Sequence, residues 1–147
     1  MSDSMAMEIM LVEDNPQDAE LALRALRAAK IANHISVARD GAEAVDLLFG
    51  EASRRISAAP KVILLDLKLP KIDGLEVLKR IKSDPRTKFI PVVVLTSSRE
   101  QKDIVESYRL GVNSYIVKPV DFERFADAVQ KAGIYWLLIN QPPEVAE

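Results

Sequence analysis

Residues 62–70 read VILLDLKLP. The stretch begins with four apolar residues, Val62 to Leu65, and becomes polar at Asp66. An unbroken apolar run of this length is expected for a central strand, because such a strand is covered on both faces of a sheet. Residues 92–96 read VVVLT and repeat the pattern. The two runs predict central strands of a parallel sheet.

Short apolar segments alternate with longer segments of helical periodicity along the rest of the chain. The other predicted strands are Glu8–Val12, His34–Ala38 and Ser114–Val117, and the predicted helices are about Gln17–Lys30, Ala42–Phe49, Gly74–Ser83, Gln101–Leu110 and Asp121–Leu138. Alternation of strands and helices predicts an α/β fold with helices on both faces of a parallel sheet. Five strands in this order fit a doubly wound, flavodoxin-like (βα)5 sheet with spatial order 2-1-3-4-5.

The length of 147 residues suits one domain. We expect it to span residues 7–139, with an extended C-terminal helix, after a disordered leader (residues 1–6) and before a frayed tail (residues 140–147). The formal net charge of −2 provides no basic surface for nucleic acid. No apolar run reaches the roughly 18 residues that cross a membrane. The absence of cysteine suits a reducing compartment, so a cytoplasmic protein is expected.

Polar side chains follow the predicted strands at the points where they end. Glu13 and Asp14 follow the first strand and Asp66 the third, while Thr96 ends the fourth and Lys118 follows the fifth. In a doubly wound sheet these carboxyl ends form the ligand-binding rim. Three carboxylates that converge there need raised pKa values or a cation. Because the ligands are oxygens, with no cysteine or nearby histidine, Mg²⁺ suits the site best.

The same side chains provide what phosphoryl transfer requires. That reaction depends on positioned charge more than on covalent chemistry by the protein. A carboxylate such as Asp66 can act as the nucleophile and become an acyl phosphate. Lys118 and a cation would offset the charge that develops, and the hydroxyl of Thr96 can donate a hydrogen bond.

These motifs together resemble the receiver domain of response regulators, the phosphoacceptor half of two-component signalling. The resemblance covers about Met7 to Lys131 and is carried by five motifs in a specific order, which are Val12-Glu13-Asp14-Asn15, Leu64 to Pro70, Asp73-Gly74, Leu95-Thr96-Ser97-Ser98, and Gly111 to Pro119. The resemblance implies a signalling switch rather than an enzyme, although such a switch takes part in its own phosphorylation and dephosphorylation.

The resemblance also implies a role for each matching residue. Asp66 would be the phosphoacceptor, and Glu13 and Asp14 the acid pair that holds Mg²⁺ together with Asp66. The remaining roles fall on the backbone carbonyl of Lys68 as a further metal ligand, Thr96 and Lys118 as contacts of the phosphoryl group, a cis bond between Lys118 and Pro119, and Tyr115 as an aromatic switch on the output face.

A narrower resemblance concerns the partners. The insertion at residues 54–60 and the aromatic tail Tyr135-Trp136-Leu137-Leu138 are similar to single-domain regulators paired with bacterial phytochrome kinases. The implied donor is a sensor histidine kinase such as a phytochrome, or a histidine phosphotransfer protein. Tyr135, Leu138 and Ile139 extend the apolar surface of the last helix beyond a receiver core, so a homodimer is also expected.

Other interpretations of the same residues remain open. An aspartate-nucleophile phosphatase shares the carboxylate, cation and lysine, but such enzymes resemble a family with a second aspartate where this chain has Lys68. A pseudo-receiver scaffold would bind partners without phosphorylation, and a flavin-binding flavodoxin shares the fold. The only histidine, His34, lies at the start of a strand, away from the rim, and is interpreted as structural.

Overall fold

A computed structural model describes residues 8–30, 34–50, 60–118 and 122–141 of the chain. Five parallel strands form one sheet in the order β2-β1-β3-β4-β5, as the sequence predicts. The strands are β1 (Ile9–Val12), β2 (Ile35–Ala38), β3 (Val62–Leu65), β4 (Val92–Thr96) and β5 (Ser114–Val117). The predicted leader, most of the insertion before β3 and the end of the tail lie outside the described residues.

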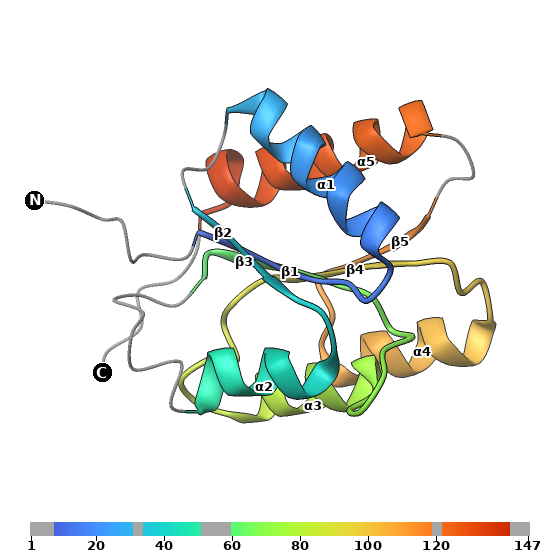
Figure 1. Cartoon of the computed structure of the whole chain (residues 1–147). Coiled ribbons are helices and arrows are strands. Elements are labelled where there is room, and N and C mark those ends of the chain that lie inside the picture. Colours follow the sequence, from blue (N-terminus) through green and yellow to red (C-terminus); the bar gives the residue numbers. More distant parts are fainter. Residues whose placement is uncertain (1–7, 31–33, 51–59, 119–121, 142–147) are drawn as a thin grey trace, which may run out of the picture.

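Five α-helices cover the sheet in two layers. They are α1 (Pro16–Ala29), α2 (Gly41–Phe49), α3 (Gly74–Ser83), α4 (Gln101–Leu110) and α5 (Phe122–Ile134). Helices α1 and α5 lie together on one face, while α2, α3 and α4 cover the other (Figure 1). The doubly wound α/β fold predicted from the sequence is therefore confirmed.

Two apolar clusters hold the layers to the sheet. Every residue of β1, β3 and β4 is buried, whereas β2 and β5 at the edges are mostly half-buried. Because alternate side chains of a strand point to opposite faces, Ile63 and Leu65 pack toward α3, while Val62 and Leu64 pack toward α1 and α5. This two-sided burial explains why the central strands are continuous apolar runs.

Short polar side chains set the starts of three helices. Asn15 accepts a hydrogen bond from the backbone N–H of Asp18 at 3.0 Å, and Pro16 occupies the first turn of α1. Asp40 accepts from Glu43 N at 2.8 Å, and Asp73 caps α3 in the same way. Each cap satisfies a backbone donor that the first turn of a helix leaves unpaired. Helix α1 is thereby held in a fixed position just after β1.

Gly74 brings the start of α3 close to the end of β3. A Cβ atom at this position would lie 2.5 Å from the carbonyl oxygen of Asp66 and from the Cα of Leu67. The backbone N–H of Gly74 donates to the carbonyl of Leu67 at 2.9 Å. Only glycine allows this approach, and it supports the backbone that carries Asp66.

The C-terminal helix departs from the prediction of one helix over 121–138. The α-helix ends at Ile134 and continues as a π-helical turn, η2 (Tyr135–Ile139), which closes with a 2.7 Å hydrogen bond from Asn140 N to the carbonyl of Tyr135. Gly133 weakens the α-helix just before this change. Trp136 packs against the core in this turn, and its ring meets that of Tyr135 edge-on at 4.9 Å.

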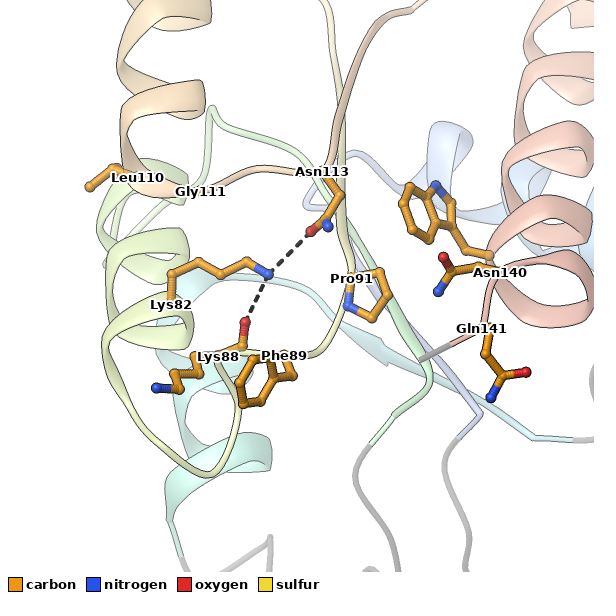
Figure 2. Close-up of a pocket in the computed structure, with 10 residues that line it drawn as sticks. Lys82, Lys88, Phe89, Pro91, Leu110, Gly111, Asn113, Asn140 and Gln141 are labelled. Carbon is orange, nitrogen blue, oxygen red and sulfur yellow. Dashed lines mark hydrogen bonds between the residues drawn. The ribbon is translucent and has the colours of Figure 1, made fainter. Parts of the chain in front are cut away.

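A lysine ties together the end of the sheet that lies opposite the predicted site. Lys82 of α3 donates to the carbonyl of Lys88 and to Oδ1 of Asn113, each at 3.1 Å (Figure 2). It also donates to the carbonyl of Ile90 at 2.7 Å. The same Asn113 oxygen accepts from Val92 N at 2.8 Å. Burial lowers the pKa of Lys82 to about 8, so the side chain is still mainly protonated at pH 7. The ammonium group of Lys82 therefore donates all three of its hydrogen bonds within the protein.

We expect Lys82→Met to lower the free energy of unfolding by about 1–3 kcal/mol at pH 7, because the substitution removes these donors and leaves the partly buried carbonyl of Ile90 without its donor. Lys79→Met, at an exposed position of the same helix, is the matched control and should change stability by less than about 0.5 kcal/mol. Urea denaturation of the three proteins measures the difference. Equal stability of both variants would show that Lys82 does not hold this end of the sheet.

Candidate functional site

The candidate site lies at the carboxyl ends of four strands. Glu13 directly follows β1, Asp66 follows β3, Thr96 is the last residue of β4, and Lys118 follows β5. The paired registers place these four positions side by side along one edge of the sheet. The structure therefore brings together residues that are about 100 positions apart in the chain.

Three carboxylates form a compact acid cluster at this edge. Glu13, Asp14 and Asp66 each offer an oxygen, and these oxygens all lie within 4.8 Å of one another. Glu13 and Asp66 are buried, with 3% and 6% of their surfaces exposed, whereas Asp14 is open to solvent. The cluster thus has two carboxylates held in the protein and one that reaches water.

Lys118 is the positive centre of the site. Its Nζ lies 2.8 Å from Oε1 of Glu13, 2.8 Å from Oδ2 of Asp18 and 3.0 Å from Oδ2 of Asp66. Its side chain is only 10% exposed. An ammonium group has three protons, so these three carboxylates use every donor that Lys118 has.

Asp18 is the residue that sequence analysis missed. It belongs to the first turn of α1, where an acidic residue is ordinarily explained by the helix dipole. The signal that could have identified Asp18 is the helix cap formed by Asn15 and Pro16. This cap starts α1 right after the acid pair, so that Asp18, the third helical residue, points back toward the rim. Its distance of 100 positions from Lys118 kept the pairing out of reach of any local pattern.

The charges of the site shift the pKa values of both buried partners. Burial raises the pKa of Glu13 to about 7 despite the hydrogen bond from Lys118, and the charge of Asp66 adds to the rise. Burial alone would lower the pKa of Lys118, but hydrogen bonds to Asp18 and Glu13 and the charge of Asp66 raise it above its usual value. Lys118 is therefore a permanent cation at neutral pH.

The carboxylate of Asp66 is held by its own backbone surroundings. The backbone N–H of Asp66 donates to the carbonyl of Val12 at 3.0 Å, and this hydrogen bond continues the ladder between β3 and β1. Its Oδ1 accepts from the backbone N–H of Lys68 at 3.2 Å, while Oδ2 faces Lys118. The side chain of Lys68 is exposed and extends to Oδ2 of Asp103 at 3.5 Å.

A hydrogen-bonded group connects the end of β4 with Tyr115. Thr96 is fully buried, and its Oγ1 accepts from Ser98 N at 3.4 Å. The hydroxyl of Ser98 donates to Asp103 of α4 at 2.5 Å, and this hydrogen bond lowers the pKa of Asp103 below its usual value. The hydroxyl of Tyr115 donates to the carbonyl of Ser98 at 3.0 Å. Tyr115 thus faces inward, in contact with the loop that follows Thr96.

The donor set fits a hard divalent cation. Four acids (Glu13, Asp14, Asp18 and Asp66) stand around one lysine, so negative charge is in excess. Two like charges about 4 Å apart repel by about 4 kcal/mol at an effective dielectric of 20, which a bound cation would relieve. Carboxylate oxygens with one side open to water are the ligands that such cations prefer. The Lys118–Pro119 bond, predicted to be cis, lies outside the described residues.

This fold, with an acid cluster and a lysine at the rim, defines the receiver domain of response regulators. The family model described as the response regulator receiver domain matches residues 9–130, and the chain belongs to this family. It is a signalling protein with the phosphoacceptor function of a response regulator. Among the described residues, no helix is long and apolar enough to span a bilayer.

Several relatives are phytochrome response regulators. The chain is 41% identical to the response regulator Rcp1 of Synechocystis sp., over 88% of each chain. The Mn²⁺-bound structure of Rcp1 superposes with a TM-score of 0.86 and 39% identity, over 94% of this chain and 99% of Rcp1. The phosphorylated cyanobacterial phytochrome response regulator RcpA has a TM-score of 0.87 at 42% identity, over 95% and 99%. The bacteriophytochrome response regulator AtBRR is 53% identical, with a TM-score of 0.71 over 92% and 99%.

A divalent cation should stabilise the folded protein, because only the folded chain assembles the acid cluster. At free Mg²⁺ of ten to a hundred times its dissociation constant, we expect the free energy of unfolding to rise by roughly 1.4–2.7 kcal/mol. Asp14→Asn should remove most of this gain, whereas Asp127→Asn, at an exposed position of α5, should keep it. Thermal melts with Mg²⁺ and with chelator measure the effect, and an equal gain in both variants would contradict it.

Proposed function

We propose that Asp66 is the phosphoacceptor of this response regulator. The observation that carries the proposal is the position of its buried carboxylate, 3.0 Å from the ammonium of Lys118 and inside the acid cluster. A nucleophile in this setting faces one fixed positive charge and one region suited to a cation. Such positioned charges are what a phosphoryl group needs as its negative charge develops.

The chemical step moves a phosphoryl group from a histidine nitrogen of the donor to a carboxylate oxygen of Asp66. An oxygen of the Asp66 carboxylate forms a bond to phosphorus, and the bond from phosphorus to the ring nitrogen of a phosphohistidine breaks. The electron pair of that bond stays with the imidazole, which takes a proton. Hydrolysis of the resulting acyl phosphate by water returns the carboxylate and inorganic phosphate, so that the signal ends without loss of any protein group.

We assign the cation as Mg²⁺, with Glu13, Asp14, Asp66 and the backbone carbonyl of Lys68 as the protein groups that would hold it. When bound, Mg²⁺ supplies positive charge to the phosphoryl oxygens. Asp14 suits a direct ligand because it is exposed. Glu13 is already engaged by Lys118 at 2.8 Å and suits contact through water. The Mn²⁺-bound form of Rcp1 supports a divalent cation in a close relative.

The response to phosphorylation would pass through β4 and β5. The hydroxyl of Thr96 and the ammonium of Lys118 would contact the new phosphoryl oxygens. A shift of Thr96 would move the loop whose Ser98 carbonyl holds the hydroxyl of Tyr115 at 3.0 Å. Tyr115 is therefore proposed as the switch, with α4 as the surface that changes.

The proposed phosphodonor is a sensor histidine kinase. The relatives of this chain favour a phytochrome as that kinase. RcpA is described as a phytochrome response regulator and AtBRR as a bacteriophytochrome response regulator. A histidine phosphotransfer protein would provide the same phosphohistidine chemistry. We propose that the protein works in the cytoplasm, a reducing compartment that suits a chain without cysteine.

Incubation with acetyl phosphate and Mg²⁺ should add one phosphoryl group to the wild-type protein, measured by mass spectrometry of the intact chain. Asp66→Asn should add none, because an amide does not replace the carboxylate nucleophile. Asp127→Asn serves as the control and should react like the wild type. A wild-type protein that stays unmodified would favour a pseudo-receiver scaffold. Rapid turnover of an aryl phosphate that Asp66→Asn abolishes would favour a phosphatase.

A homodimer is proposed through the C-terminal apolar patch, which consists of Ile134, Tyr135 and Ile139. These side chains are 37%, 46% and 65% exposed, although all three are large and apolar. The side chain of Leu138, which is also predicted to belong to this surface, lies outside the described residues. Neighbouring apolar side chains exposed on one turn are typical of a protein interface. The patch continues the surface of Trp136, which packs on the core beside α1 and α5.

Light scattering after size-exclusion chromatography tests this interface. We expect Ile139→Lys to raise the dissociation constant of the dimer at least about tenfold, because it removes a large apolar side chain from the interface. Val105→Lys, on the exposed face of α4, is the matched control. A wild-type monomer at about 100 μM, far above the dissociation constants of stable dimers, would contradict the homodimer. Dissociation by Val105→Lys alone would place the interface on α4.

A further inference from the structure

Asp18 accepts one of the three hydrogen bonds that Lys118 can donate, although it belongs to a different element from the acid cluster. The contact is 2.8 Å, as short as that to Glu13 and shorter than the 3.0 Å contact to Asp66. Among the described residues, the acids that could share a cation are Glu13, Asp14 and Asp66. Asp18 is therefore placed to act on the reaction through Lys118.

A phosphoryl group on Asp66 brings new oxygens that compete for Lys118. All three N–H groups of the ammonium already donate hydrogen bonds. A phosphoryl oxygen can therefore accept one only if Lys118 gives up one of its present contacts. Release of Glu13 would leave a carboxylate that is only 4% exposed without its partner, which is costly. Asp18 is 31% exposed, so water can solvate it once it is released.

We infer that Asp18 is a positioning residue that restrains Lys118 in the resting protein and competes with the phosphoryl group for its positive charge. The inference rests on the proposed phosphorylation of Asp66. The negative charge of Asp18 opposes phosphorylation in two ways. It shares the charge of Lys118, and it repels the anionic phosphodonor at close range.

The geometry of α1 keeps Asp18 in this position. Asn15 caps the helix by accepting from the Asp18 backbone N–H at 3.0 Å, so the first turn is fixed while the carboxylate points to Lys118. The simpler role for Asp18 is an acid that stabilises the helix dipole. The two roles predict different kinetics, because loss of a dipole contact lowers stability without accelerating phosphorylation.

The test compares initial rates of phosphorylation by acetyl phosphate with saturating Mg²⁺ at low salt. Asp18→Asn keeps an oxygen that can accept from Lys118 but removes the charge, and we expect its rate constant per donor concentration to rise about three- to fivefold, on the order of a partly exposed ion pair. Asp18→Glu retains the charge, so its rate should lie between those of the wild type and Asp18→Asn. Thermal unfolding of each variant reports the helix contribution separately.

Glu20→Gln is the matched control, because it removes one negative charge from the same helix at a site that faces Arg24 and not Lys118. Its rate should stay within about twofold of the wild type. An Asp18→Asn rate equal to that of Glu20→Gln, or slower than the wild type, overturns the inference, since Lys118 would then exchange its Asp66 contact instead. If the wild type itself takes no phosphoryl group, the proposed function fails rather than the role of Asp18.

Discussion

The site depends on one interaction, the contact of a nearly buried ammonium group with carboxylates from three different elements. Lys118 lies within 3.0 Å of Glu13, Asp18 and Asp66, which come from the ends of β1 and β3 and from the first turn of α1. Burial of so much negative charge would be prohibitive without this partner. The balance is still incomplete, because Asp14 adds a fourth acid, and this unbalanced charge is what makes the rim receptive to a cation.

The sheet makes that arrangement possible because its position is fixed at both ends. At the rim, the cap at Asn15 and the close approach of Gly74 hold the segments that carry Asp18 and Asp66. At the opposite end, Lys82 joins α3 to the loops before β4 and β5. A rigid frame matters to a switch, since the energy of a new phosphoryl contact can then move a few side chains without deforming the core. The proposed switch would act through the hydrogen-bonded group formed by Thr96, Ser98 and Tyr115.

Sequence patterns predicted most of the fold with little error. The bounds of β3, β4 and β5 and of α3 and α4 agree with the predicted ranges residue by residue, because apolar runs and capping residues are local signals. The two largest departures have physical reasons. Helix α5 changes to a π-helical turn at Tyr135, just after Gly133, a residue that weakens an α-helix. Asp18 resembled any acid at a helix start, and its partner Lys118 lies 100 positions away in the chain.

The sequence by itself determined which residue types stand at the strand ends, and with them the class of chemistry at the rim. Strand ends are marked by a change from apolar to polar residues, and parallel topology then places those ends along one edge. Only the tertiary structure decided how the charges are shared. Lys118 donates its three hydrogen bonds to Glu13, Asp18 and Asp66. These contacts depend on distances between residues that lie at least 52 positions apart in the chain. Electrostatic energies depend on distance and burial, which a linear pattern does not contain.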